Sequence, residues 1–149
     1  MRAHDMVGHL IRRLNQISTH VFSKHMQDIG LDLTPVQFAA MDAILTYPGI
    51  DQAGVAAKIA YDRATIGGVI DRLEQKGYVA RKVSKRDRRA REVRLTKTGQ
   101  NIFDQILPHV TALQNEILPE FTPDERAKFL ELARKAIDKT QSNNDSNLN

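Results

Sequence analysis

The densest cluster of charge in the chain is the segment ARKVSKRDRRAREVRLTKTG, residues 80–99. From Arg81 to Arg94 it holds eight basic residues against two acidic ones, Asp87 and Glu92. Basic residues at this density bind polyanions, because each cation can neutralise one phosphate and arginine can donate paired hydrogen bonds. The chemistry predicted is recognition of nucleic acid, with binding to anionic lipid or a merely solvated charged turn as alternatives.

The basic character is local. The 149 residues carry a formal net charge of +4, and residues 81–94 contribute +6, so the remainder sums to −2. A hydrophobic content of 41% is ordinary for one soluble domain of this length. The chain has no cysteine, which excludes disulfides and thiol redox sensing, and it has no long apolar run. We therefore expect no membrane segment and a cytoplasmic, nucleoid-associated location.

Catalysis is not predicted. An enzyme acting on nucleic acid needs clustered metal-binding carboxylates or an activated nucleophile. The acidic residues near the basic segment are few, and no phosphate-binding glycine loop is present. The five histidines include no i, i+4 pair, so we also predict no metal and no cofactor.

Four helices are predicted before the basic segment. The first is a long amphipathic helix that ends near Gly30. A capping box at Thr34 begins the second, and Asp51 caps a short third helix. Asp62 is expected to cap the fourth, RATIGGVIDRLEQKG, with Gly77 at its C-cap position.

Two short β-prone runs, YVARKV and REVRL, predict a hairpin with the basic segment as its loop. Thr96 then caps a long helix that Pro108 should kink or break, and a capping box at Thr122 begins the last helix. The long helix also carries a stripe near the 3.5-residue period of a helix–helix seam: Ile106, Val110, Leu113 and Ile117. We predict that the terminal helices pack with those of a second copy.

This order of elements is that of a winged helix-turn-helix. The fold class predicted is mainly α with a small β-hairpin wing, flanked by N- and C-terminal dimerisation helices. We place the N-terminal dimerisation helix at 1–33, the DNA-binding region at 34–95 and the C-terminal dimerisation helices at 96–139. A disordered tail is expected at 140–149, and the whole forms one compact domain.

The fourth helix would enter the DNA major groove with its N-terminal turns. Its apolar face leaves five residues available to DNA: Arg63, Ala64, Thr65, Gly68 and Arg72. Arginine reads guanine, and threonine contacts phosphate or a thymine methyl group. The pair Gly67-Gly68 costs roughly 1 kcal/mol per glycine in a helix, which close approach of DNA or of a neighbouring helix would offset. Simple tolerance of the glycines and a solvated face are the alternatives.

The wing residues resemble a known signature. SKRDRRAREVRLTKTG is similar to the wing of the MarR family of bacterial transcriptional regulators, a D-x-R within a basic hairpin followed by L-T-x-x-G. The similarity extends over residues 7–139 and includes LTPVQFAAMDAI. It departs from the family before Asp87, where Lys85-Arg86 stands in place of a frequent proline.

The resemblance implies a homodimer that binds double-stranded DNA with one winged helix from each subunit. It implies that Arg89 enters the minor groove, that Asp87 orients it, and that Arg81 and Arg86 lie near phosphates. Arg88 lies with Arg89 near the middle of the loop, where a tip is expected.

Members of the family are commonly repressors that a small anionic or phenolic ligand releases. Candidate cations for a carboxylate are His9, Arg12, Arg13 and His20, although Arg12 and Arg13 could equally be solvated surface. Candidate apolar walls are Phe38, Met41 and Tyr47. The function predicted is a repressor that binds a pseudo-palindromic operator and is released by an aromatic carboxylate. The alternative is an architectural protein that coats DNA with little sequence preference.

Overall fold

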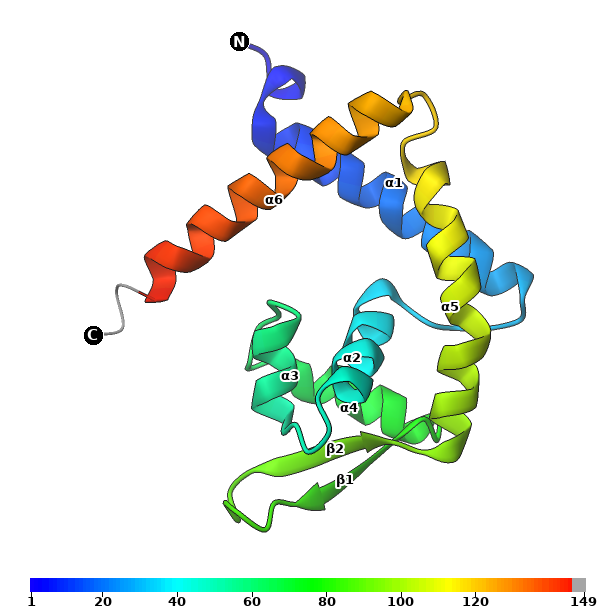
Figure 1. Ribbon diagram of the computed structural model, residues 1–149, viewed down its shortest axis with the longest axis vertical. Helices are drawn as coiled ribbons and strands as arrows, with labels where there is room; N and C mark the ends of the chain where they lie inside the picture. Colours follow the sequence, from blue (N-terminus) through cyan, green and yellow to red (C-terminus); the bar gives the residue numbers. More distant parts are fainter. Residues whose placement is uncertain (146–149) are drawn as a thin grey trace. The chain divides into compact units, whose positions relative to one another are not determined.

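The computed structural model describes the backbone of residues 1–145 and the side chains of residues 1–138 (Figure 1). The chain divides within α5 into two compact units, Met1–Leu113 and Gln114–Asn149. The elements are η1 (Ala3–Asp5), α1 (Val7–Asp28), α2 (Pro35–Thr46), α3 (Gln52–Lys58), α4 (Ile66–Gln75), β1 (Val79–Val83), β2 (Arg91–Leu95), α5 (Lys97–Ile117) and α6 (Pro123–Asp145). The predicted fold class is confirmed: the protein is mainly helical with a two-stranded antiparallel wing.

Local capping signals fix where most of the helices begin. At α2 the Thr34 hydroxyl accepts from the backbone of Gln37 and the Gln37 side chain accepts from the backbone of Thr34, each at 3.2 Å. The Asp51 carboxylate caps α3 through the backbone of Gly54 at 2.7 Å. These bonds satisfy N–H groups that a helix start leaves without intrahelical partners. The same box repeats at Thr122 before α6.

The core of the first unit joins the helix-turn-helix to α1 and α5. Three phenylalanines form a row: Phe38 of α2 lies 6.2 Å from Phe22 of α1 and is stacked at 5.2 Å on Phe103 of α5. The largest fully buried side chains come from α1 to α5 and from both strands: Met26, Met41, Val55, Ile66, Ile70, Leu73, Val79, Val93, Ile106 and Leu113. The wing and α4 are therefore held by the same core.

The hairpin follows directly from α4. Gly77 has a φ of +76°, a conformation that glycine adopts without steric cost, and it turns the chain from α4 into β1 as predicted. Strands β1 and β2 pair in register from Val79↔Leu95 to Val83↔Arg91. The chain before α3 adds a further bridge to β2, with Val93 donating to the carbonyl of Ile50 at 3.0 Å. The hairpin is thus tied to the start of α3 as well as to the end of α4.

The predicted start of α4 is wrong, and of the kink or break predicted at Pro108 the break does not occur. The helix α4 begins at Ile66, because Asp62 forms a separate turn in which its carboxylate accepts from Ala64 and its carbonyl accepts from Thr65 and Ile66. The helix α5 shows no break at Pro108, which lies inside it with an exposed side chain. Proline removes one hydrogen bond of the helix, and the remaining turns keep α5 continuous.

Three of the four residues of the stripe predicted as a seam with a second copy are buried within the single chain, and the fourth, Ile117, is half-buried. Ile106 and Leu113 are fully buried, and Val110 is 7% exposed. The 3.5-residue spacing marked a face that is largely buried within one chain, and the packing of the terminal helices with a second copy stays a prediction.

In the second unit, Arg126 binds the end of α5. Its guanidinium donates to the carbonyls of Gln114 and Asn115 at 3.3 Å and of Leu118 at 2.9 Å. A cation is favourable there because a helix C-terminus carries unpaired carbonyls and partial negative charge. The helix α6 extends to Asp145 and so includes the first residues of the predicted tail 140–149, while residues 146–149 lie outside the described residues. Within the described part, no helix has the length and apolar character needed to cross a membrane.

Candidate nucleic-acid interface

The turn of the wing is organised by a serine that the sequence did not single out. Ser84 is 7% exposed, and its hydroxyl accepts from the backbone of Arg86 at 3.2 Å and of Asp87 at 3.4 Å. Its own N–H donates to the carbonyl of Ala90 at 3.0 Å, which closes the loop. The signal available in the sequence was a serine three residues before an aspartate, a common turn pattern. Ser84 thus fixes the backbone of the turn through three hydrogen bonds.

Asp87 and Arg89 form the pair that their spacing suggested. The Asp87 carboxylate accepts from the backbone N–H of Arg89 at 3.0 Å and lies 3.5 Å from its Nε. The Arg89 side chain is nevertheless 94% exposed. An exposed ion pair adds little to stability, so the main effect of Asp87 is to orient the guanidinium of Arg89. Arg86 and Arg88 are exposed on the same loop.

A groove of about 420 Å³ lies between the wing and the turn that precedes α4. Arg63 lines it from the turn, and Arg89 and Arg91 line it from the wing. Two carboxylates also line the groove, Asp51 at the cap of α3 and Asp87 of the wing, together with Gln52 and the buried Ile66. Cations on both sides of one groove suit a polyanionic backbone that passes between them.

The predicted recognition residues are all exposed. Ile66, Val69, Ile70 and Leu73 are buried, as predicted, whereas the five candidate DNA contacts are exposed: Arg63, Ala64, Thr65, Gly68 and Arg72. Three of them, residues 63–65, belong to the turn that precedes α4, and Gly68 and Arg72 belong to the helix itself.

The two glycines of α4 differ in their surroundings. A Cβ added to Gly67 would lie 3.2 Å from the side-chain nitrogen of Gln52, so this glycine lets α3 approach α4. A Cβ added to Gly68 would meet nothing within 4 Å. A side chain at position 67 would crowd Gln52, whereas no contact within the described chain requires glycine at position 68.

We expect Gly68→Ala to change stability and DNA binding in opposite directions. The helix should gain up to about 1 kcal/mol in free energy of unfolding, because alanine is the better helix former. DNA affinity should fall about tenfold if the methyl group prevents close approach, a cost of about 1.4 kcal/mol. Urea unfolding and a DNA titration measure the two effects. Gly8→Ala, at a helical glycine of α1 that also meets no atom, is the control and should leave DNA binding unchanged.

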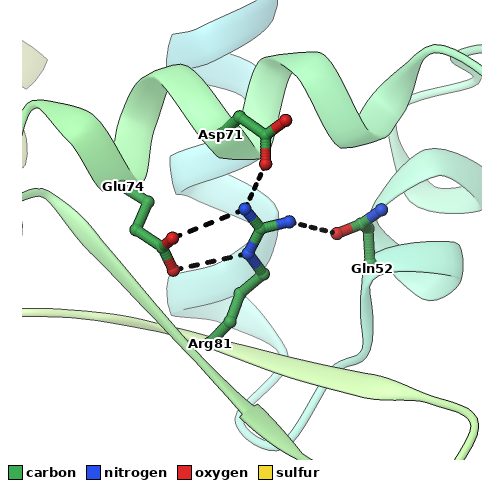
Figure 2. A network of polar contacts seen from close by, with 4 residues as sticks. All are labelled: Gln52, Asp71, Glu74 and Arg81. Carbon is green, nitrogen blue, oxygen red and sulfur yellow. Dashed lines mark hydrogen bonds and ion pairs between the residues drawn. The ribbon is translucent and has the colours of Figure 1, made fainter.

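Arg81 takes part in a network of polar contacts with residues of two helices (Figure 2). Its guanidinium is bonded to Asp71 and Glu74 of α4 and to Gln52 of α3, and its side chain is 20% exposed. The hydrogen bond that Arg81 donates to the Asp71 carboxylate is the main cause that raises the pKa of Arg81 above its ordinary value, although burial opposes the shift. The resemblance implied that Arg81 lies near phosphates. In the structure its guanidinium is bonded to three side chains of the protein itself.

The predicted ligand residues are only partly brought together. Phe38 and Tyr47 line a pocket of about 400 Å³ between α2 and the end of α3. Met41 is fully buried in the core and does not line it. The predicted cations of α1 do not line it either: His9 and Arg12 are bonded to each other at 3.3 Å, Arg13 is bonded to Gln16, and His20 is exposed.

The pocket instead contains a cation that the sequence analysis missed. The Lys58 ammonium lies 4.3 Å from the centre of the Tyr47 ring. Its only sequence signal was a basic residue in the last turn of a short helix, which is also an ordinary place for lysine. Asp42 lines the same pocket, so the site is not purely basic. In the described part of the chain, no three potential metal ligands come together.

A basic hairpin beside a helix-turn-helix, with cations on both sides of one groove, defines a winged helix-turn-helix DNA-binding protein. Residues 31–90 match the model of the MarR family. The HTH-type transcriptional repressor NicR of Pseudomonas putida is 30% identical over 138 residues, which cover 93% of this chain and 86% of the relative. The chain belongs to the MarR family of DNA-binding transcriptional regulators, which are not enzymes.

Solved structures share the fold over nearly the whole chain. Bordetella bronchiseptica BpsR, described with its regulation of DNA binding by 6-hydroxynicotinic acid, has a TM-score of 0.84 and 29% identity, and the match covers 93% of this chain and 97% of BpsR. A mutant MarR of Escherichia coli complexed with operator DNA has a TM-score of 0.79 and 27% identity, and the match covers 87% of this chain and 92% of that one.

Proposed function

We propose that this regulator is a homodimeric repressor that binds a pseudo-palindromic operator and is released by a small aromatic carboxylate. The observation that carries the DNA-binding part is the groove with Arg63 on one side and Arg89 and Arg91 on the other. Each subunit would place the turn before α4 and α4 itself in the major groove and Arg89 in the adjacent minor groove. As a DNA-binding regulator of a bacterial family, it would act in the cytoplasm.

Apolar side chains that the single chain leaves exposed support a dimer. They lie on α1 and on α6: Val7, Leu10, Ile11, Ile17, Leu130, Leu132 and Ile137. Large apolar side chains on several turns of one helix are typical of a surface that a partner covers. We propose that these residues, rather than the buried stripe of α5, form the contact with the second copy.

Selection from a random pool of DNA duplexes at about physiological salt tests the proposal. A symmetric dimer presents two recognition helices about one DNA turn apart, so the recovered sequences should contain an inverted repeat with half-sites about 10 bp apart. Recovery of A·T-rich DNA without a repeat would contradict the proposal, because charge and groove shape alone would then account for binding.

The effector site proposed is the pocket of Phe38, Tyr47 and Lys58. Its volume of about 400 Å³ suits a small aromatic ring, and one wall is apolar while Lys58 supplies a cation for a carboxylate. BpsR, whose DNA binding is described as regulated by 6-hydroxynicotinic acid, supports this class of ligand. Asp42, on the same pocket, would disfavour a second negative charge on the ligand.

We expect Lys58→Met to raise the concentration of aromatic acid needed for release from DNA. Loss of one charge-assisted hydrogen bond of about 1.5–3 kcal/mol corresponds to at least about a tenfold increase. The measurement is a titration of operator-bound protein with 6-hydroxynicotinate and with benzoate. Lys24→Met, at an exposed lysine of α1 away from this pocket, is the control. Equal release of the parent and Lys58→Met proteins would rule out this site.

A further inference from the structure

Arg81 links three elements of the DNA-binding region. It lies on β1, where its Nε is 3.3 Å from the Glu74 carboxylate and its Nη2 is bonded to Asp71, both on α4. Its Nη1 donates to the side-chain oxygen of Gln52, on α3, at 3.1 Å. Figure 2 shows the guanidinium with one carboxylate on each of two sides and the amide on a third. All three nitrogens of the guanidinium thus have a protein partner.

The electrostatics of this network disfavour a phosphate contact. Two carboxylates surround a single cation, so the cluster as a whole is negative and would repel a phosphate. A DNA-binding protein has an electrostatic reason to avoid acidic residues on its recognition helix. Asp71 and Glu74 are exposed on α4 nonetheless. Their presence has an explanation if their role is to hold Arg81.

We propose that Arg81 is a positioning residue for DNA recognition, which fixes the wing strand β1 against α4 and the first turn of α3. The planar guanidinium has donors in fixed directions, so it sets both the distance and the angle between the elements that it joins. β1 leads into the wing loop with Arg89, and α4 carries Gly68 and Arg72. The network therefore sets how far the minor-groove arginine lies from the major-groove helix. It also reaches the groove itself, because Gln52 lines that groove.

The direction in which DNA affinity changes when the two carboxylates are removed distinguishes a positioning role of Arg81 from a phosphate-binding role. In Asp71→Asn/Glu74→Gln two negative charges near the DNA are removed and Arg81 is released. If Arg81 served as a phosphate contact, this variant would bind every DNA more tightly. The proposal predicts that affinity for the selected operator falls about tenfold, while affinity for an unrelated duplex stays equal or rises. The ratio of specific to non-specific affinity is the readout, since a uniform loss of folded protein would not change it.

A second variant keeps the positive charge at position 81 but loses the fixed directions of the guanidinium donors. Arg81→Lys has one ammonium group and cannot reach three partners in fixed directions, so the same ratio should fall by a similar factor. Lys82→Gln is the matched control: Lys82 is the next residue of β1, and its ion pair with Glu92, at 3.5 Å, stays within the hairpin. This control should leave the ratio unchanged.

A distance measurement keeps the inference testable even if no operator is recovered. The chain has no native cysteine, so spin labels can be placed at Lys85→Cys in the wing and Gln75→Cys at the end of α4. With labelled subunits diluted in an excess of unlabelled ones, so that the distance within one subunit is measured, the parent protein should give one narrow distance distribution, which Arg81→Lys broadens and Lys82→Gln does not. A narrow distribution in Arg81→Lys, or an unchanged affinity ratio in both network variants, would overturn the positioning role. Absence of any operator preference in the parent protein would instead count against the proposed function.

Discussion

Gly99→Ala should lower the free energy of unfolding by about 3 kcal/mol, a large part of the 5–15 kcal/mol typical of a domain. A Cβ at this position would lie 2.0 Å from the carbonyl oxygen of Tyr78 and 2.8 Å from its carbonyl carbon. Both atoms belong to the backbone, so no side chain can rotate to make room.

The backbone of Tyr78 is held where the clash occurs. Its carbonyl accepts from the N–H of Thr96 at 3.0 Å, and the Thr96 hydroxyl both donates to the carbonyl of Gly77 and accepts from the N–H of Gly99 at 3.0 Å. Thr96 and Gly99 thus join the end of α4 to the start of α5. Relief of the clash would break these bonds.

Urea unfolding of Gly99→Ala measures the loss. Gly68→Ala is the matched control, because its Cβ meets no atom within 4 Å and should not destabilise the protein. Equal stability of Gly99→Ala and the parent would show that α5 can move away from Tyr78 at little cost, and would remove this explanation of the L-T-x-x-G pattern.

Arg89→Ala should weaken operator binding by about 1–3 kcal/mol, or about 5- to 150-fold, with the greatest loss on sites flanked by A·T-rich DNA. A narrow A·T-rich minor groove concentrates negative potential and attracts an inserted arginine. The side chain is 94% exposed and bonded only to its neighbour Asp87, so the variant should fold as the parent does.

The measurement is a comparison of dissociation constants on the operator with A·T-rich and with G·C-rich flanks. Arg134→Ala, an exposed arginine of α6, removes the same charge elsewhere and should have little effect. Small and equal losses on both duplexes would mean that Arg89 contributes charge alone and does not enter the groove.

The elements that the sequence predicted correctly depend on short-range signals. The caps at Thr34 and Asp51 and the turn at Gly77 are formed by residues within a few positions of one another, so their patterns are readable without the fold. The start of α4 was misplaced because Asp62 caps a separate turn before the helix, and an aspartate that caps a turn has the same local sequence pattern as one that caps a helix.

Roles of residues that depend on contacts between distant parts of the chain were harder to predict from the sequence. The periodicity of Ile106 and Val110 marked a buried face, but periodicity does not identify which chain buries it. Arg81 stands in a basic run and is indistinguishable there from an arginine that binds DNA, because its partner Gln52 is 29 residues away. Lys58 likewise gains significance only when α2 and α3 place it over Tyr47.

The central claim is that two copies bind one operator together, and a change of half-site spacing tests it most directly. Insertion of about 5 bp between the half-sites of the selected repeat rotates one half-site by half a DNA turn and leaves both sequences intact. Two chains should bind the original duplex, and the insertion should reduce affinity about tenfold or more, because a rigid dimer can then reach only one half-site. Equal affinity for the two duplexes would show that each chain binds independently and would contradict the dimeric regulator.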